Sequence, residues 1–452
     1  MSLRNGLAGL AAALLPLAAG AASSTAPQSA LTAVLFENVR IFDGTSARLS
    51  APSNVLVVGN LIQSISSQAV AAPAGTTLTR IQGGGRTLMP GLIDNHVHIA
   101  LSTTGQADLL SPATTAEILQ ARATAEAGDM LMRGFTSVRD MGGPMLTARP
   151  AIDKGELPGP RIYASGAMVS QTSGHGDSRL PQERSRRFFG EVSKGEQLGA
   201  NYIADGRDEV LTATRENLRA GATQIKVMAG GGAASAYDPL DVTQYTLDEM
   251  KAAVEAASDW NTYVTVHAYT PRAVRRAVDA GVLCIEHGQL LDEDTMKLLA
   301  DKGIWLSLQV LDPAPPTAPE STRLKKARVI DGTSSAYVWA RKYGVRLAWG
   351  TDFLFDPRQN ARQAADILKL KQWFTPAEIL KMVTHDNAQL LALSGPRNPY
   401  QTGKLGVVEA GAYADLLLVD GDPIANVGLI GDPAKNFIVI MKDGRVYKNT
   451  LP

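Results

Sequence analysis

The sequence predicts a (β/α)₈ barrel, or TIM barrel, with a small β-sandwich formed from both ends of the chain. Three observations support this prediction. Short apolar, β-branched runs alternate with amphipathic helical patterns through the middle of the chain, shorter strand-like runs flank that region, and four of the six histidines stand at the ends of predicted strands. Strand–helix alternation is typical of parallel sheets, and eight repeats favour a barrel over an open sheet.

Eight candidate strands and eight candidate helices make up the predicted barrel. Each strand is a nearly continuous apolar run, as expected where both faces of a sheet are buried. The strands are residues 88–99, 136–141, 161–166, 224–229, 263–268, 283–288, 305–309 and 346–352. The helices are residues 115–133, 208–220, 247–257, 271–280, 292–301, 323–343, 360–371 and 376–391. The longest break, between Gly166 and Arg207, is expected to be a functional loop, because idle loops of this length are uncommon.

The flanks of the barrel read as short strands with Gly, Asn or Pro between them. The candidates are residues 34–40, 54–58, 61–66, 78–81, 414–419, 437–442 and 445–448. Neither flank has enough strands for a stable sheet of its own. We therefore expect residues 33–86 and 402–452 to form one sandwich around a barrel of residues 87–401. The alternative is two separate decorations on the barrel.

The N-terminus has the order of a secretory signal peptide in residues 1–21. A short segment with Arg4 precedes an apolar run over residues 6–17, and Ala19-Gly20-Ala21 supplies a small-residue cleavage site. The run is shorter than the ~20 residues that span a bilayer. We expect a periplasmic or secreted protein whose mature chain begins near Ala22 and has no membrane span; the alternative is an uncleaved anchor or a disordered tail.

The composition excludes several classes of protein. Of 452 residues, 45% are apolar and 19% charged, which argues against disorder, and 44 basic residues balance 44 acidic ones. A near-neutral chain lacks the basic surface that binds a polyphosphate backbone, so we expect no nucleic-acid partner. Cys284 is the single cysteine, which excludes an intrachain disulfide and a structural metal site built from thiolates.

Histidines and one aspartate at strand ends predict a metal site. His96 and His98 are two residues apart, so on a strand both imidazoles point to one face. His267, His287 and Asp352 end three other candidate strands. In a barrel these ends share one rim, where active sites lie. A lone strand histidine is more often structural, but four on one rim with a carboxylate favour a site for Zn²⁺ or a similar ion.

Lys226 is unusual because it stands inside an apolar strand, in the segment Gln224-Ile225-Lys226. An unpaired ammonium in a barrel interior is costly or shifts its pKa. One interpretation is a lysine that reaches the rim or pairs with an acid. The other is a carbamate, formed with CO₂, whose two oxygens bridge two metal ions ~3.5–4 Å apart. Lysine chemistry alone leaves both open.

These motifs resemble the amidohydrolase superfamily. Residues 89–98, MPGLIDNHVH, are similar to its opening motif, and the lysine, two histidines and aspartate that follow match its binuclear metal-dependent members. Residues 204–206, 224–232 and 285–288 resemble the prolidase and imidazolonepropionase-like branch. Residues 170–177, SQTSGHGD, resemble secreted ochratoxinase-type amidohydrolases. The similarity covers nearly the whole chain after residues 1–21.

The resemblance implies a ligand set and a mechanism. The more buried of two divalent ions, with Zn²⁺ expected and Mn²⁺ or Co²⁺ also compatible, would be bound by His96, His98 and Asp352. The other would be bound by His267 and His287, and a carboxylated Lys226 would bridge both. A bridging hydroxide would attack the amide carbonyl, and Asp352 would pass its proton to the leaving nitrogen. Similar enzymes form homo-oligomers, so we expect one here.

Other candidates carry weaker signals. His175 either contacts the substrate, donating to its carbonyl oxygen, or is a structural loop histidine, and Tyr237 either binds substrate or is merely exposed. Arginines within residues 167–206, in a patch of Arg184, Arg186 and Arg187, either bind a substrate carboxylate or are solvated.

Three further residues or pairs read as structural. Arg139 and Asp140 are expected to pair with each other. His385 is expected to be structural on the final helix, and Cys284 to be inert core.

The expected function is hydrolysis of an amide bond by an amidase or carboxypeptidase-type reaction. The expected substrate class is a small N-acyl amino acid or dipeptide with a free carboxylate. The resemblance to ochratoxinase-type enzymes implies the specific expectation, ochratoxin A, cleaved to ochratoxin α and phenylalanine. The main alternative is a prolidase-like Xaa-Pro dipeptidase. A cyclic amidase or imidazolonepropionase fits less well, because export suits small cytosolic catabolites poorly. Outside enzymes, the alternative is a metal-binding or carbohydrate-binding barrel without catalysis.

Overall fold

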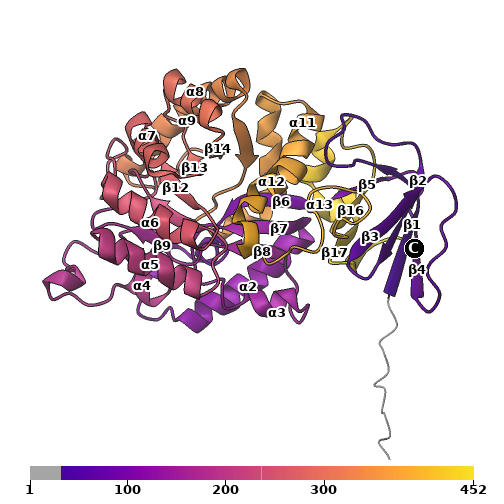
Figure 1. The fold of residues 1–452 in the computed structure, drawn as a ribbon, viewed down its shortest axis with the longest axis horizontal. Helices are drawn as coiled ribbons and strands as arrows, with labels where there is room; N and C mark the ends of the chain where they lie inside the picture. Colours follow the sequence, from indigo (N-terminus) through magenta and orange to yellow (C-terminus); the bar gives the residue numbers. More distant parts are fainter. Residues whose placement is uncertain (1–31, 236) are drawn as a thin grey trace, which may run out of the picture.

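The computed structural model describes residues 32–235 and 237–452. The predicted leader, residues 1–21, lies outside these ranges. The described strands form three sheets, two of them parallel and drawn from the middle of the chain, the third drawn from both ends. Figure 1 shows the parallel sheets with their helices on one side of the molecule, and the indigo and yellow strands of the two chain ends together on the other.

The parallel sheets contain three and seven strands. The first has the order β6 (Leu92–Val97), β7 (Phe135–Asp140), β8 (Arg161–Ala164). The second has the order β10 (Asn201–Ile203), β9 (Met168–Ser170), β11 (Ile225–Met228), β12 (Val264–Ala268), β13 (Cys284–His287), β14 (Trp305–Leu308), β15 (Arg346–Trp349). Helices lie between most of these strands, which confirms the predicted alternation. The apolar side chains of the strands are mostly buried, as expected for a parallel sheet with both faces covered.

Backbone hydrogen bonds join the two parallel sheets at two places. Just after β15, the amide of Asp352 donates to the carbonyl of His96 on β6 at 2.8 Å. Just before β11, the amide of Thr223 donates to the carbonyl of Ala164 on β8 at 2.9 Å. Gly350 lies so close to His96 that a Cβ at this position would overlap the His96 backbone. Glycine is therefore what allows β15 to approach β6.

The longer helices begin and end where the sequence supplies caps. They are α2 (Ala116–Met132), α5 (Arg207–Arg219), α6 (Leu247–Asp259), α7 (Pro271–Ala280), α8 (Glu293–Lys302) and α9 (Glu320–Tyr343). Helix α6 starts with a capping box between Thr246 and Glu249. Gly303 and Gly344 end α8 and α9 in the left-handed conformation that glycine adopts without strain.

The two last predicted helices are segmented. Residues 360–371 fall in η3 (Pro357–Arg362), α10 (Gln363–Asp366) and η4 (Ile367–Gln372), and residues 376–391 contain a π-helical turn, η5 (Met382–Asp386), between α11 (Pro376–Lys381) and α12 (Asn387–Leu391). The remaining short helices are η1 (Leu101–Thr103), α1 (Gln106–Leu109), α3 (Arg149–Asp153), η2 (Arg186–Phe188), α4 (Lys194–Gln197), η6 (Ala392–Arg397), η7 (Val427–Gly431) and α13 (Pro433–Asn436).

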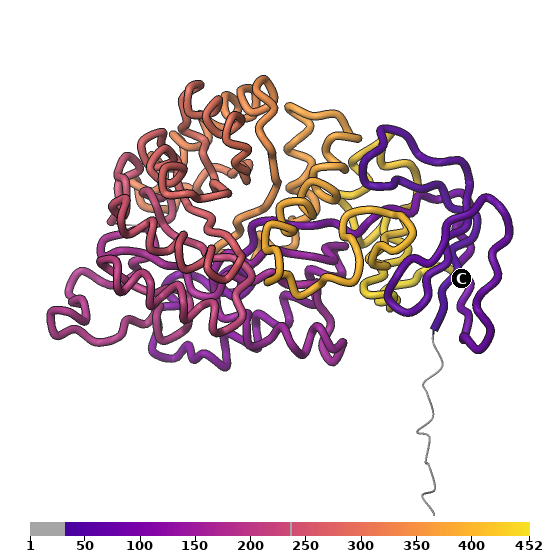
Figure 2. Tube along the Cα trace, in the orientation of Figure 1, coloured from indigo at the N-terminus to yellow at the C-terminus, as the bar shows by residue number. Residues whose placement is uncertain are grey.

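Both ends of the chain contribute to one eight-stranded sheet. Its order is β18 (Arg445–Asn449), β17 (Phe437–Lys442), β16 (Leu416–Val419), β5 (Thr87–Pro90), β1 (Thr32–Ile41), β2 (Ser53–Val58), β3 (Leu61–Ser66), and β4 (Thr77–Gln82) pairs in parallel with β1. Strand β5 pairs with β16 and with β1, so it joins the C-terminal strands to the N-terminal ones. The indigo and yellow tubes meet accordingly in Figure 2.

The predicted strand 88–99 is divided at Gly91. Residues before Gly91 belong to β5 in the end sheet, and those after it to β6 in the three-stranded sheet. The amide of Gly91 donates to Asp415 at 2.9 Å, and a Cβ at this position would overlap the side chain of Thr136. A continuous apolar run conceals this change of sheet, because both halves are buried.

The long break between Gly166 and Arg207 is not an irregular loop throughout. It contains β9 and β10, which extend the seven-stranded sheet, and the short helices η2 and α4. Between β9 and β10, Phe188 is 68% and Phe189 100% exposed.

Among residues 32–235 and 237–452, no helix combines the length and apolar character needed to cross a bilayer.

Candidate metal centre

The structure brings the four predicted ligand histidines together where β6, β12 and β13 end. The ring centroids of His96 and His98 are 5.3 Å apart, those of His96 and His287 5.2 Å, and those of His267 and His287 4.3 Å. All four side chains are buried. Segments that are far apart in the sequence therefore form one cluster, as their places at strand ends predict.

His96 and His98 each have one ring nitrogen held by an acceptor of the protein. Nδ1 of His96 lies 2.8 Å from Oε2 of Glu286, and Nδ1 of His98 lies 3.1 Å from the carbonyl oxygen of Gly142. A carboxylate or a carbonyl accepts a hydrogen bond, so Nδ1 carries the proton in both rings. Nε2 is then the nitrogen with a free lone pair.

His267 and His287 are oriented in the same manner. Nε2 of His267 lies 3.2 Å from the carbonyl oxygen of Gly231, which leaves Nδ1 free, and Nδ1 of His287 lies 2.7 Å from Oε1 of Gln309, which leaves Nε2 free. Metal-binding histidines almost always donate their other N–H to such an acceptor. The hydrogen-bonding chemistry of all four rings therefore fits metal ligation.

Asp352 is the carboxylate at the centre of the cluster. Its Oδ1 lies 3.3 Å from Nε2 of His96 and 3.4 Å from Nε2 of His98. One ligand atom from each of His96, His287 and Asp352 lies within 4.8 Å of the others. The residue has a positive φ of 53°, as His287 does with 80°, and such strained backbone is often found at functional sites.

Burial sets the charge states of these groups. It lowers the pKa of His96 to about 4 and of His287 to about 3, and it holds the pKa of His267 well below its ordinary value. Burial alone would raise the pKa of Asp352, but the imidazoles that face it hold that pKa far below the ordinary value. At neutral pH His96, His267 and His287 are therefore neutral imidazoles and Asp352 is an ionised carboxylate, the forms that bind a divalent cation.

Lys226 lies on β11 inside the same cluster. Its Nζ is 3.4 Å from Nε2 of His96, and its side chain is buried. Burial lowers the pKa of Lys226, which favours the uncharged amine. An uncharged amine is the form that reacts with CO₂, so the position is compatible with the carbamate interpretation of this lysine.

The expected pairing of Arg139 with Asp140 is wrong. Arg139 is buried and donates from Nη2 to Oε1 of Glu286 at 2.7 Å and from Nε to the carbonyl of Asn95 at 2.7 Å. Asp140 instead accepts from the amide of Ile99 at 2.8 Å. Neighbours along a strand point to opposite faces, so these two side chains diverge. Arg139 and Glu286 thus form an ion pair beneath the histidines.

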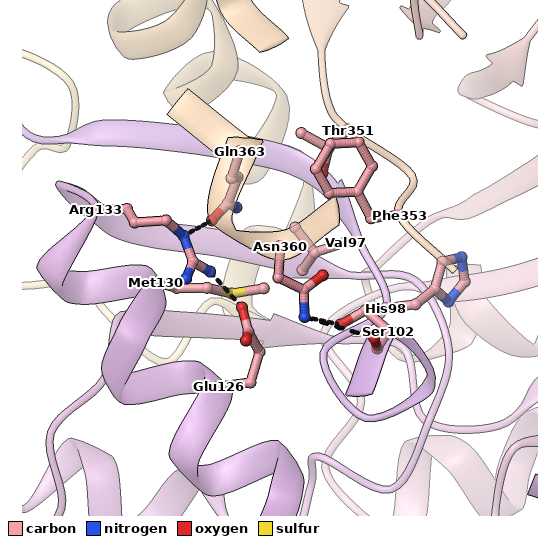
Figure 3. A pocket seen from close by; sticks show the side chains of 10 residues that line it. All are labelled: Val97, His98, Ser102, Glu126, Met130, Arg133, Thr351, Phe353, Asn360 and Gln363. Atoms are coloured by element: carbon pink, nitrogen blue, oxygen red, sulfur yellow. Dashed lines mark hydrogen bonds and ion pairs between the residues drawn. The ribbon is translucent and has the colours of Figure 1, made fainter. Parts of the chain in front are cut away.

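A polar network supports the segment around His98. The residues there, drawn in Figure 3, line a cavity of about 10 Å³, which is close to the smallest volume that holds one water. Nε of Arg133 donates to Gln363 at 3.1 Å, and Arg133 also pairs with Glu126. Gln363 in turn donates to Asp94 at 3.0 Å.

Asp94 connects this network to Thr351, the residue that precedes Asp352. It accepts from the amide of Thr351 at 3.1 Å and from the Thr351 hydroxyl at 2.7 Å. Burial raises the pKa of Asp94 to about 6. These bonds fix the residue that precedes Asp352, so Asp94 helps to hold the Asp352 backbone in its strained conformation.

The weaker candidates have different outcomes. The ring of His175 stacks on His267 with centroids 4.0 Å apart, so it borders the cluster. Tyr237 is 53% exposed. Three loop arginines pair with acids of the chain: Arg179 with Asp177, Arg186 with Glu196, and Arg187 with Glu209.

His385 and Cys284 are outside the cluster's ligand positions. Nδ1 of His385 lies 2.9 Å from Oδ1 of Asp386. Cys284 is buried beside Glu286, and burial raises the pKa of its thiol to about 12. A thiol with this pKa is unreactive at neutral pH, in agreement with the expectation of inert core.

A comparison with protein families shows the family to which the chain belongs. The model of the amidohydrolase family matches residues 87–449. The chain belongs to the amidohydrolase family. The resemblance inferred from residues 89–98 and from the order of the ligand residues is thereby confirmed, and the protein is an enzyme of the class that hydrolyses C–N bonds.

Relatives of this amidohydrolase include enzymes from both predicted branches. Ochratoxinase of Aspergillus niger is 32% identical over 373 residues, which are 80% of this chain and 75% of that protein. Imidazolonepropionase of Deinococcus radiodurans is 25% identical and is matched over 81% of this chain and 85% of its own. A solved prolidase complexed with N-methylphosphonate-L-proline has a TM-score of 0.84 and 32% identity, covering 93% of this chain and all of that one.

Sequence reasoning missed the residues that orient the four histidines predicted as ligands in this amidohydrolase. These are Glu286, Gln309 and the carbonyls of Gly142 and Gly231. Glu286 carried a signal, since a carboxylate inside an apolar strand requires a partner. A backbone carbonyl has no such signal, because every residue supplies one.

Proposed function

We propose that the protein is a binuclear metal-dependent amidohydrolase that cleaves the amide bond of an N-acyl amino acid or dipeptide with a free carboxylate. The hydrolysis of ochratoxin A to ochratoxin α and phenylalanine is the specific reaction. The observation that carries the proposal is the orientation of four buried imidazoles, each with one nitrogen bound to a protein acceptor and the other free, around Asp352 and Lys226.

The proposed ligand set follows the positions predicted from the sequence. His96, His98 and Asp352 would hold one divalent ion, most simply Zn²⁺, and His267 and His287 the second. Lys226, carboxylated at Nζ, would hold both. When bound, such ions lower the pKa of a water molecule and polarise the amide carbonyl.

The chain's own residues supply the proton transfer. Asp352, ionised at neutral pH, would take a proton from the attacking water while the water oxygen bonds to the carbonyl carbon. It would give that proton to the nitrogen as the C–N bond breaks, so one carboxylate acts as base and then acid. Asp94 and Thr351 hold Asp352 in place for both steps. His175, beside His267, is proposed to contact the oxygen of the scissile carbonyl.

The substrate choice is supported by the similarity to ochratoxinase. That protein is 32% identical over 80% of the present chain. A prolidase-like Xaa-Pro dipeptidase is the second candidate, favoured by the solved prolidase with its TM-score of 0.84. Both substrates are amides with a free carboxylate. Arg186 and Arg187 of the predicted patch already pair with acids. Besides His175, the sequence-predicted candidates to contact the substrate are therefore Tyr237 and Arg184.

The proposal includes an architecture and a location. The two parallel sheets, bonded at Asp352–His96 and Thr223–Ala164, would form one closed (β/α)₈ barrel over residues 87–401. Residues 33–86 and 402–452 would fold their shared sheet into a sandwich. We further propose cleavage of residues 1–21, a periplasmic or secreted location and a homo-oligomer.

The test is a hydrolysis screen of N-acyl amino acids, Xaa-Pro dipeptides and ochratoxin A, with and without a chelator. We expect cleavage of aromatic N-acyl amino acids, loss of activity with chelator, and little cleavage of the same substrates as methyl esters. His96→Asn should be inactive, and His385→Asn, a matched change outside the cluster, should be active.

Two results would overturn parts of the proposal. Rapid Xaa-Pro cleavage without turnover of aromatic amides would replace the substrate choice with the dipeptidase. Zinc-loaded wild-type protein that hydrolyses no amide, ester or lactone would favour a metal-binding barrel without catalysis.

A further inference from the structure

A buried carboxylate outside the proposed ligand set faces His175. Asp238 lies on the segment that follows β11, and its side chain is almost fully buried. Its Oδ2 is 3.2 Å from Nδ1 of His175 and accepts from the amide of Gly232 at 2.7 Å, while its Oδ1 accepts from the hydroxyl of Ser235. Although burial opposes ionisation, the bonds from His175 and Ser235 hold the pKa of Asp238 below its ordinary value.

The His175 ring is held in one orientation by these neighbours. Its Nδ1 lies 2.8 Å from Oγ of Ser235 in addition to the contact with Asp238, and its backbone amide donates to Gln244 at 2.9 Å. One face of the ring is stacked on His267. In the part of the chain that the structure describes, its polar ring contacts all involve Nδ1. Nε2 is therefore the ring nitrogen available to a substrate.

The backbone around Asp238 is itself held by a lysine of α9. Nζ of Lys325 donates to the carbonyl oxygens of Gly232, Ser235 and Asp238 at 2.8, 2.8 and 2.9 Å. A Cβ at Gly232 would overlap the imidazole of His175. The ring thus packs directly against the backbone that carries Asp238, which leaves little freedom in their relative positions.

We propose that Asp238 is a positioning residue for His175. Asp238 lies 3.2 Å from Nδ1 and accepts from the Ser235 hydroxyl, whose oxygen is 2.8 Å from the same nitrogen. The carboxylate thereby favours the proton on Nδ1 and leaves Nε2 for the substrate, as a buried aspartate does for the histidine of a catalytic triad. This inference rests on the proposed function, in which His175 contacts the substrate. If Asp238 only stabilised the fold of its segment, its replacement would have the same effect on stability. The effect of that replacement on kcat would then not depend on whether His175 is present.

The experiment is a double-mutant cycle on the metal-loaded full chain with the best substrate of the hydrolysis screen. The variants are Asp238→Ala, His175→Ala and the double variant, with Asp238→Asn as the conservative change and Asp241→Ala as an exposed control on the same segment. Asn keeps an oxygen for Gly232 and His175, and its amide group can face Ser235. Metal content and thermal unfolding are measured for each variant.

We expect kcat of Asp238→Ala to fall about 10- to 100-fold, with KM within about twofold and metal content unchanged. His175→Ala should lower kcat at least as much, and adding Asp238→Ala to it should change kcat no further. Asp238→Asn should regain most of the wild-type kcat, and Asp241→Ala should retain all of it.

Three results would overturn the inference. They are an unchanged kcat in Asp238→Ala, an equal further loss when Asp238→Ala is added to His175→Ala, and a loss of bound metal in Asp238→Ala, which would show action through His267 instead. If Asp238→Ala does not fold, an Asp238→Asn variant as inactive as His175→Ala would also contradict it. These outcomes differ from failure of the proposed function, in which the wild type itself would hydrolyse no substrate.

Discussion

At the scale of single residues, the histidines matter less by their number than by their orientation. Each of the four has one nitrogen bound to the protein, and the acceptors are chemically varied: a carboxylate, an amide oxygen and two backbone carbonyls. Such acceptors would fix the tautomer before the proposed metal ions bind. Rings oriented in this way need little rearrangement on binding, so the site is largely pre-formed.

Asp352 should be indispensable for turnover but not for metal binding. We predict that Asp352→Asn lowers kcat by about 10²- to 10⁴-fold, the range of general acid–base catalysis, because the amide oxygen can remain near the ligands but cannot accept the proton of water. Steady-state kinetics and elemental analysis of the same preparation check this. Wild-type turnover by Asp352→Asn would exclude the proposed proton transfer.

At the scale of elements, the segment from Gly231 to Asp238 serves two histidines at once. The carbonyl of Gly231 orients His267, and Asp238 faces His175. Lys325 on α9 holds this segment by three carbonyls. A helix on the outside of the sheet is thereby coupled to the site.

Removal of the Lys325 ammonium should loosen that segment. We predict that Lys325→Met increases amide hydrogen exchange in residues 231–235 and lowers kcat severalfold, because three carbonyls lose their donor. Exchange measured by mass spectrometry, with Lys302→Met on the end of α8 as the control, checks this. Unchanged exchange around Gly232 would mean that the lysine does not hold the segment.

Most of the elements and the clustering of the candidate ligand residues could be predicted from the sequence, because apolar runs and histidines at strand ends are local patterns. The division of strand 88–99 at Gly91 could not, because both halves are equally apolar and only the tertiary partners Asp415 and Thr136 distinguish them. The pairing of Arg139 with Glu286 joins residues 147 positions apart, so no local pattern reports it.

At the scale of the whole molecule, a buried arginine joins the parallel sheets to the end sheet. Arg161 on β8 donates to both oxygens of Asp415, at 2.8 and 3.2 Å, and to Asp443 at 2.5 Å. Its guanidinium lies 3.8 Å from the ring centre of Tyr413. These partners come from the C-terminal flank, so the contact links segments more than 250 residues apart.

Loss of this contact should destabilise the protein strongly. We predict that Asp415→Ala lowers the free energy of unfolding by about 3–5 kcal/mol, because it leaves a buried charge without its main partner. Asp420→Ala, which removes an exposed pair with Arg86 between the N-terminal and C-terminal flanks, should change it by less than about 1 kcal/mol. Denaturant unfolding of both variants is the measurement, and equal effects would contradict the prediction.

The same cluster predicts a dependence of stability on pH. Burial raises the pKa of Asp443, but Arg161 outweighs it and holds the pKa below the ordinary value of 3.8. A carboxyl with a depressed folded-state pKa stabilises the fold above its unfolded pKa, and the contribution is lost as the pH falls through the folded value. The stability difference between wild type and Asp443→Asn should therefore be constant between pH 7 and about 5 and shrink below about 4. A stability difference that grows as the pH falls would mean that folding raises the pKa of Asp443.

The metal content of the purified protein tests the proposed chemistry most directly. Elemental analysis should find two divalent transition-metal ions per chain in wild type, with fewer in Lys226→Ala and in His267→Asn, and an unchanged content in His385→Asn. Amide hydrolysis should disappear with the metal and return when Zn²⁺ is added. A protein that cleaves amides at full rate in chelator, with no stoichiometric metal bound, would contradict this chemistry.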